Sequence, residues 1–380
     1  MNIRRIAGTG LLAALALVAC AARAIEAPKP QPPREEAPQQ QPPPEMSVTP
    51  TDERAFYEKI QRVTAFRSMR GIKVPADVIA ELGRGNADTV VVALNKLASG
   101  GDNDANIALV LVQHWCAAVS QQRAGDPKAA IAKLVQNQPE RRAARVAGVI
   151  YAEVDYMQKA RNSCAAAMRQ FDFRGVEARL RAAAAAGDAA SATELAQFLR
   201  DPAQREEMLQ TAVKKNYPPA VYKIATNLLI AVQRGVTTEN VSQIRELLKI
   251  AGREIPRAKL DLANCMAVGC DGHPADAMTA RAFGLDAARD GEPTAFTSMV
   301  RMPWGRFPRE ELLAWQYFGD RLNEAGCMGD QYVPTTLAFG QTIALLERNV
   351  KPQTLEEART RTEALWNEHG VRAMKENGCE

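Results

Sequence analysis

The feature that most constrains the fold is a pattern of small and apolar residues that recurs between residues 175 and 300. In its first copy, Ala182-Ala183 is followed by Gly187-Asp188 and then by Leu195-Ala196. The later copies comprise residues 209–225, 247–263 and 285–299, with Ile224, Leu262 and Met299 in the place of Leu195. Similar units that follow one another at steps of 29, 38 and 37 residues predict stacked helical hairpins, each burying its open face against the next.

Signals for helices extend over most of the chain. Segments with apolar residues three or four positions apart predict helices at 87–98, 103–120, 141–170, 221–232 and 355–375. Prolines suited to the first helical turn predict further starts at Pro50, Pro75, Pro127, Pro202, Pro256, Pro274 and Pro308. No alternating run of β-branched residues competes with these segments, so we expect an all-α fold.

The order of an Ala-Ala helix end, a Gly-Asp or Pro turn and a Leu-Ala segment resembles the Sel-one-like repeat, a relative of the tetratricopeptide repeat. The resemblance is clearest over residues 175–300, and an outlying copy is expected around Leu97, Gly101-Asp102 and Leu109. It implies a right-handed superhelical solenoid of antiparallel helical hairpins. It also implies an adaptor role, since proteins of this family often act as adaptors in the bacterial envelope.

The N-terminus has the features of a targeting signal. Arg4 and Arg5 precede an apolar segment that ends in Leu17-Val18-Ala19-Cys20, and this arrangement is typical of a secretory signal peptide. The four closing residues resemble the lipobox of bacterial lipoproteins, in which the cysteine is lipidated. We therefore expect cleavage before Cys20 and, because residue 21 is alanine, sorting to the outer membrane. The alternative is cleavage after Ala24 and release of a soluble protein.

Residues 25–50 contain nine prolines and few large apolar side chains. Such a composition cannot bury enough surface to fold, and it favours an extended polyproline conformation. We expect this segment to be a disordered tether between the lipidated cysteine and the folded part. The alternative is that it is a Pro-rich ligand that binds in a groove of a partner protein. The expected organisation is a signal peptide at 1–19, a tether at 20–50 and a helical repeat domain at 51–380.

Once Cys20 is lipidated, six cysteines remain, an even number that can pair completely in an oxidising compartment. Cys265 and Cys270 flank Gly269, whose turn can bring them within bonding range. For the others we predict pairing of Cys116 with Cys164 and of Cys327 with Cys379.

Composition and motifs point away from several classes of function. The formal charge of +4 provides too weak a field for nucleic acid, and no apolar run after the signal is long enough to span a bilayer. His114, His273 and His369 have no metal-ligand spacing, and no motif for a nucleophile or a bound phosphate occurs. We expect no cofactor and no catalysis. The alternatives are a cell-wall enzyme, which would lack the Glu-Ser pair of lytic transglycosylases, and a binder of peptidoglycan or β-lactam-like ligands.

A loop bounded by Pro303 and Pro308 remains as a candidate contact site. It contains Trp304, Arg306 and Phe307, residue types that concentrate binding energy in interfaces. The competing interpretation is that Trp304 and Phe307 plug the end of the repeat core. The sequence thus predicts an envelope lipoprotein whose helical solenoid binds partner proteins.

Overall fold

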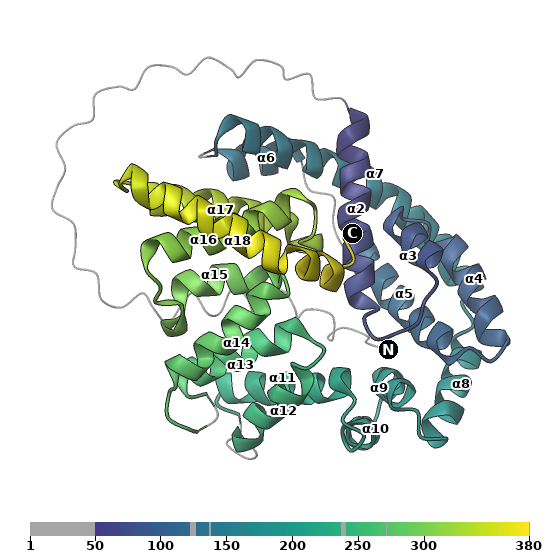
Figure 1. The fold of residues 1–380 in the computed structure, drawn as a ribbon. Coiled ribbons are helices and arrows are strands. Elements are labelled where there is room, and N and C mark those ends of the chain that lie inside the picture. Colours follow the sequence, from purple (N-terminus) through teal and green to yellow (C-terminus); the bar gives the residue numbers. More distant parts are fainter. Residues whose placement is uncertain (1–49, 122–126, 137, 237–240, 271, 380) are drawn as a thin grey trace. The chain divides into compact units, whose positions relative to one another are not determined.

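Every element in the described part of the chain is a helix. The computed structural model describes residues 50–121, 127–136, 138–236, 241–270 and 272–379, which form α-helices and short 3-10 helices without a strand. The expected all-α class is confirmed. Figure 1 labels the helices α2 (Pro50–Ser68), α3 (Ala76–Gly83), α4 (Ala87–Ser99), α5 (Asn103–Gln121), α6 (Pro127–Val135), α7 (Glu140–Gln170), α8 (Phe173–Ala185), α9 (Ala189–Phe198), α10 (Pro202–Val213), α11 (Pro218–Gln233), η1 (Val241–Gln243), α12 (Ile244–Ala251), α13 (Pro256–Val268), α14 (Ala277–Arg289), α15 (Pro293–Arg301), η2 (Pro303–Gly305), α16 (Arg309–Glu324), η3 (Gly329–Gln331), α17 (Tyr332–Glu347) and α18 (Pro352–Asn377).

The chain divides into two units between Met46 and Ser47, and all described residues belong to the second unit. The predicted signal peptide, Cys20 and the predicted tether up to Thr49 lie outside the described residues.

Three of the four predicted hairpins between residues 175 and 300 share one turn geometry. Between α8 and α9, the N–H of Gly187 donates to the carbonyl of Ala184 (2.9 Å), and the N–H of Asp188 donates to that of Ala183 (2.9 Å). This pair of bonds defines a Schellman turn, whose penultimate residue needs a positive φ. Gly187 supplies it, with φ of 92°.

The same two bonds recur in other hairpins. Asn216-Tyr217 closes α10 and Gly291-Glu292 closes α14 in this way, as do Gly101-Asp102 after α4 and Gly326-Cys327 after α16. The outlying copy predicted around Gly101 is therefore a hairpin of the same kind, whereas the copy after α16 was not predicted. Ile255 closes α12 with a different bond, to the carbonyl of Ala251 (3.0 Å).

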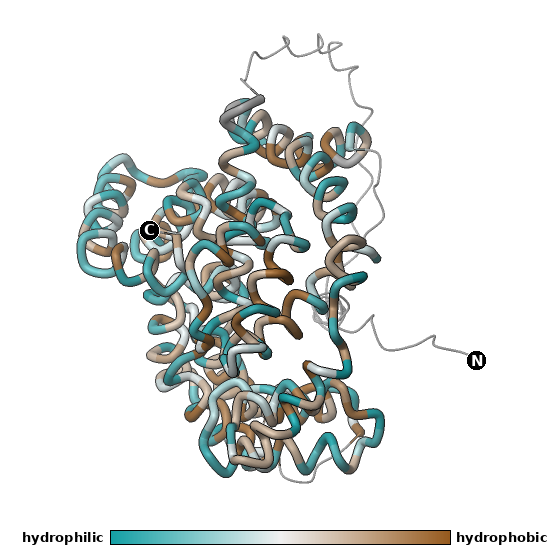
Figure 2. The backbone as a smooth tube through the Cα atoms, turned by 90° about the vertical axis from the view of Figure 1, so that its right-hand side faces the viewer, coloured by the Kyte–Doolittle hydropathy of each residue, from teal (hydrophilic) through white to brown (hydrophobic). Residues whose placement is uncertain are grey.

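The residues aligned by the sequence pattern occupy equivalent places. Leu195, Ile224, Leu262 and Met299 each lie seven residues after the N-cap of the second helix of their hairpin. All are buried except Ile224, which is half-buried. Figure 2 shows the resulting alternation of hydrophobic and hydrophilic residues along the helices. The helical-hairpin repeat expected from the sequence is thus present.

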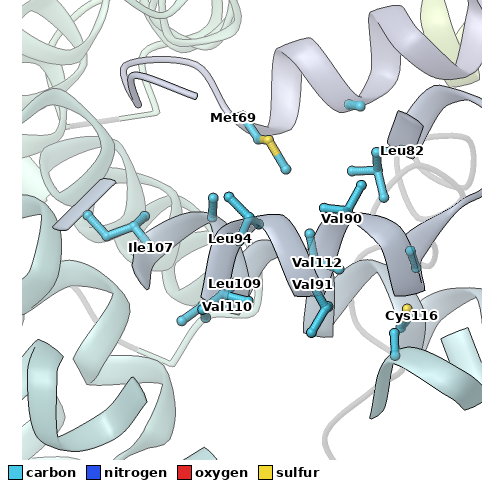
Figure 3. Packing of buried hydrophobic residues seen from close by; sticks show 14 of the residues in the cluster. Met69, Leu82, Val90, Val91, Leu94, Ile107, Leu109, Val110, Val112 and Cys116 are labelled. Atoms are coloured by element: carbon cyan, nitrogen blue, oxygen red, sulfur yellow. The ribbon is translucent and has the colours of Figure 1, made fainter. Parts of the chain in front are cut away.

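The first part of the core lies between α2, α3, α4 and α5. Met69, Leu82, Val90 and Leu94 belong to one buried cluster with residues of α5 such as Ile107, and Figure 3 shows these side chains converging from successive helices. Small and β-branched residues dominate, so the helices approach closely and the core tolerates little change in volume.

Two helices connect the first hairpin to the last. The long helix α7 packs against α4 and α5, and it also contacts α17. There Arg142 forms a bidentate pair with Asp320 of α16 (3.0 and 2.8 Å). Helix α2 packs against α3 and α7, and it also contacts η3 and α18. The hairpins therefore form a closed circuit of helix contacts.

The guanidinium of Arg67, at the end of α2, closes this circuit. Its Nε donates to Asn377 Oδ1 (2.7 Å), Nη1 to the carbonyl of Met328 (3.1 Å) and Nη2 to that of Cys327 (3.2 Å). Burial lowers the pKa of Arg67, although Glu292 and Asp330 oppose the shift. Because arginine stays charged in proteins, this is a half-buried cation held mainly by neutral oxygen atoms.

The structure forms the three predicted cysteine pairs. Cys116–Cys164 joins α5 to α7, Cys265–Cys270 closes the end of α13, and Cys327–Cys379 ties the C-terminal end to the turn before η3. The Cα atoms of these pairs lie 5.3, 4.9 and 5.4 Å apart, within the normal range for a disulfide.

One predicted helix start is wrong. Helix α14 begins at Ala277, three residues after Pro274, because Asp276 is its N-cap and accepts a hydrogen bond from the N–H of Thr279 (3.0 Å). The N–H of Asp276 is itself bound to the carbonyl of Met266 (2.8 Å). This bond holds Pro274 in the preceding loop.

Candidate functional site

The second helices of the hairpins present a common polar face. In α9, α11, α13 and α15, the residues three, seven and eight positions after the N-cap are mostly buried. Residues two, five, six and nine positions after the N-cap fall on the opposite side of a helix with 3.6 residues per turn. We call this side the second-helix face. Its exposed or half-buried polar residues are Glu194 and Gln197 of α9, Tyr222, Lys223 and Thr226 of α11, Arg257, Asp261 and Asn264 of α13, and Thr294, Thr297, Ser298 and Arg301 of α15. Thr193 and Leu260, which stand at two of these positions, are buried.

A hydrogen-bond network joins three helices across this face. Asp261 accepts from the hydroxyl of Tyr222 (2.8 Å) and from Nε of Arg257 (3.1 Å). Arg257 also donates to Oγ1 of Thr294 (2.5 Å) and lies 3.6 Å from a carboxylate oxygen of Glu292. The network therefore runs from α11 through α13 to α15.

Burial and charge set the protonation states in this network. Burial raises the pKa of Tyr222, and the Asp261 carboxylate raises it further, so the phenol stays protonated and donates. Burial lowers the pKa of Arg257, but Asp261 and Glu292 raise it by more. The side chain of Arg257 remains 46% exposed, so its charge is available to a molecule that approaches the face.

A group of basic side chains lies at the other end of the second-helix face. Lys223 interacts electrostatically with Glu194 of α9, Arg205 of α10 and His114 of α5. Burial lowers the pKa of Lys223, Glu194 opposes that shift and Arg205 adds to it. Burial also lowers the pKa of His114, which leaves this imidazole neutral at pH 7.

These basic groups have little to neutralise them. Among the described residues, the side chains of Lys223 and Arg205 make no hydrogen bond or ion pair. The Nε atom of Arg205 is buried without a partner.

The aromatic loop predicted to bind a partner is divided between core and surface. Trp304 is 1% exposed and its Nε1 donates to Asn264 (2.9 Å). The prediction of Trp304 as a partner-binding residue is therefore wrong, and the competing prediction of a core plug holds for it. Phe307 is half-buried under the guanidinium of Arg281 (3.9 Å), whereas Arg306 is exposed.

Trp304 is buried because the neighbouring helix leaves room for its ring. A Cβ atom at Gly284 of α14 would lie 2.5 Å from the indole, so only glycine admits this packing. This contact joins η2 to α14. No local signal in the sequence could have indicated it, since the two positions are brought together only by the fold.

A small pocket lies among the C-terminal helices. A pocket of about 200 Å³ lies between α16, α17 and α18 and is lined by Tyr317, Glu347, Arg359, Thr362 and Glu363; ligand sites usually measure roughly 300–1,000 Å³. The Tyr317 hydroxyl donates to Glu347 (2.6 Å). Within the described ranges no three His, Cys, Asp or Glu side chains come together to hold a metal. No described helix has the length and apolarity of a membrane span.

The motif analysis missed the second-helix face. Its signal is nevertheless present in the sequence, because Glu194, Lys223 and Asp261 stand six residues after equivalent turn residues. Charged residues at a constant distance from a repeated turn must share a face when hairpins stack.

The chain is similar to known proteins only at the level of solved structures. No protein-family model and no curated protein matches the chain. Among solved structures, it is similar to c5321, described as a protective antigen present in uropathogenic Escherichia coli strains and displaying an SLR fold. The sequences are 13% identical, the TM-score is 0.34, and the match covers 84% of this chain and 87% of that chain. The hairpin assignment rests on the turns and contacts described above.

Proposed function

We propose that this protein is a lipid-anchored scaffold of the bacterial envelope that binds partner proteins through its second-helix face. The observation that carries the binding role is the regular placement of charged side chains, at equivalent positions of successive hairpins, on the side opposite the core. Repeat proteins commonly bind through such extended surfaces because each repeat contributes the same positions.

The anchoring role rests on the sequence. The Leu17 to Cys20 motif supports lipidation of Cys20, and the prolines of residues 25–50 support a tether of tens of Å, at about 3.1 Å per residue if extended. The alanine at position 21 supports placement at the outer membrane, facing the periplasm. A lipid anchor plus a tether would leave the repeat domain free to meet proteins at some distance from the membrane.

Anchoring and binding are separable by experiment. We expect wild-type protein in the membrane fraction and the Cys20→Ala variant in the soluble fraction of the envelope. The partner is identified by chemical crosslinking in intact cells, followed by identification of the copurified proteins. We expect the same partner in repeated preparations of the wild type. We expect the Cys20→Ala variant to crosslink to that partner less often. Soluble wild-type protein that begins at Ile25 would contradict the anchor, and crosslinking without any recurrent partner would contradict the scaffold.

A further inference from the structure

The three disulfides differ in how far solvent reaches them. The cysteines of Cys116–Cys164 and Cys327–Cys379 are only 1–2% exposed, so these two bridges are closed to solvent. In the third bridge, Cys265 is 3% exposed but Cys270 is half-buried. A thiolate opens a disulfide by attacking one of its sulfur atoms, and the rate depends on access to that atom. Cys270 is therefore the bridged cysteine at which such an attack can begin.

Two exposed apolar side chains lie near this bridge. Val268, two residues before Cys270, is 59% exposed, and Met278 in the first turn of α14 is 81% exposed. The N–H of Asp276 donates to the carbonyl of Met266 (2.8 Å), and this bond holds the start of α14 beside the end of α13. An accessible disulfide with exposed apolar side chains around it offers a surface on which a second protein can dock.

The turn that contains this bridge is also held by backbone hydrogen bonds. The N–H groups of Gly269 and Cys270 both donate to the carbonyl of Cys265 (2.8 and 3.1 Å), and Gly269 supplies the positive φ of 75° that such a helix end needs. The bridge spans 5 positions of sequence, whereas the other two span 48 and 52, so it restricts the unfolded chain less than they do. The two thiols should therefore stay close together after reduction, and the bridge can form again.

We propose that Cys265–Cys270 is a reversible thiol–disulfide exchange site for a dithiol protein. A thiolate of that protein attacks Sγ of Cys270, and a mixed disulfide forms between the two proteins. The bond between the two sulfur atoms of the bridge breaks, and Sγ of Cys265 leaves as a thiolate that takes up a proton. This site goes beyond the proposed scaffold function and does not rest on it.

A second exchange step completes the reaction. The remaining thiol of the dithiol protein loses its proton and attacks the first sulfur of its own pair, which releases Cys270 as a thiolate that is then protonated. This chain gains two electrons and two protons, and the dithiol protein loses the same number and becomes a disulfide. The reverse reaction with the oxidised form of that protein restores the Cys265–Cys270 bridge.

The first experiment compares the three bridges within one protein. Full-length protein in detergent is incubated with dithiothreitol under native conditions, and free thiols are alkylated at successive times and mapped by mass spectrometry. We expect Cys265 and Cys270 to be alkylated about tenfold faster, or more, than the cysteines of the other two bridges, because exchange needs access. Oxidised glutathione, added after the reductant is removed, should restore the Cys265–Cys270 bridge. Equal rates for the three bridges, or a bridge that does not form again, would overturn the proposal.

Single-cysteine variants test which sulfur is attacked. Cys265→Ser leaves the thiol of Cys270, and Cys270→Ser leaves that of Cys265. We expect the Cys270 thiol to react with a fluorescent maleimide about tenfold faster, or more, than the Cys265 thiol, because only Cys270 is accessible. If a variant loses helical circular dichroism, the wild type reduced at this bridge and labelled with less than one equivalent of maleimide provides the same comparison. A Cys265 thiol that reacts as fast as that of Cys270 would contradict attack at Cys270.

The last experiment uses a dithiol protein in place of the small reductant. Thioredoxin, kept reduced by its reductase and NADPH, should reduce Cys265–Cys270 and leave the other two bridges oxidised. Thioredoxin should reduce the Val268→Asp/Met278→Asp variant more slowly, by about threefold or more, because a docking protein needs the apolar surface. Dithiothreitol should reduce this variant at the wild-type rate. The control Val92→Asp/Val371→Asp adds the same charges at exposed valines of α4 and α18 and should react like wild type. No reduction by thioredoxin, or equal slowing of both double variants, would overturn exchange with a dithiol protein.

Discussion

Arg67 is one of the residues that join the two ends of the described chain. It reaches Asn377 across 310 positions of sequence and the carbonyls of Met328 and Cys327 across similar separations. No carboxylate of the described residues pairs with it directly, so the interaction is a set of charge-assisted hydrogen bonds to neutral acceptors. Such an arrangement is specific, because another side chain could not satisfy all of these acceptors.

Replacement of Arg67 should therefore lower the stability of the folded protein. We expect Arg67→Met to lower the free energy of unfolding by roughly 2–4 kcal/mol, since several buried acceptors lose their donor. Arg54→Met on the same helix is the control: this side chain is 64% exposed, and its loss should change stability by less than about 0.5 kcal/mol. Urea titration followed by circular dichroism measures both; equal changes would show that Arg67 does not hold the ends together.

Trp304 and Arg306 should respond in opposite ways to truncation. Trp304→Ala removes a buried ring together with its bond to Asn264, and we expect a loss of about 3–5 kcal/mol of stability. Arg306→Ala should be neutral within about 0.5 kcal/mol, because Arg306 is exposed. Thermal unfolding of the two variants measures both changes in stability. A Trp304→Ala protein as stable as the wild type would make Trp304 a candidate for partner binding again.

Glu153 of α7 should make stability depend on pH. Burial raises the pKa of this carboxyl group above its usual 4.5, so the folded state holds its proton to higher pH than the unfolded state does. Stability should consequently fall as the pH rises from 4.5 through the folded pKa. Glu153→Gln removes this dependence. The variant should be more stable than wild type in urea titrations at pH 7 and equally stable well below pH 4.5; a variant that is less stable at pH 7 would contradict the assignment.

At the scale of elements, turns were predictable from sequence and contacts between distant helices were not. Gly187 and Gly291 mark turns through their own backbone freedom, a local property. The start of α14 was mispredicted because a bond from Asp276 to Met266 of the preceding helix decides it. The Tyr222–Asp261 bond joins residues 39 positions apart, and its formation depends on how the hairpins stack.

Asn216 tests whether the hairpin turns are equivalent. Asn216 has a φ of 54°, and it stands where the turns at Gly187 and Gly291 have a glycine. We expect Asn216→Gly to leave stability unchanged or to raise it by up to about 1 kcal/mol, and Asn216→Val to lower it by roughly 1–3 kcal/mol because β-branched residues are strained at positive φ. Chemical denaturation provides the comparison. Similar effects of glycine and valine would show that this turn differs from the others.

At the scale of the molecule, the hairpins form a closed circuit with a shared polar face. The core is divided among successive hairpins, while α2 and α7 connect the first hairpin to the last. Closure of this kind limits how the hairpins can move relative to one another. A scaffold whose face is held in one arrangement loses less conformational entropy when it binds.

Position-resolved photocrosslinking in intact cells tests the central claim most directly. A photoreactive amino acid is placed on the second-helix face, at Gln197, Thr226 or Ser298, and in parallel at exposed positions of first helices, at Arg181, Gln210 or Lys249. We predict that the face positions crosslink to one and the same partner protein and that the first-helix positions do not. Crosslinks that are equally frequent at both sets, or that occur only at the first helices, would contradict the assignment of the second-helix face as the binding surface.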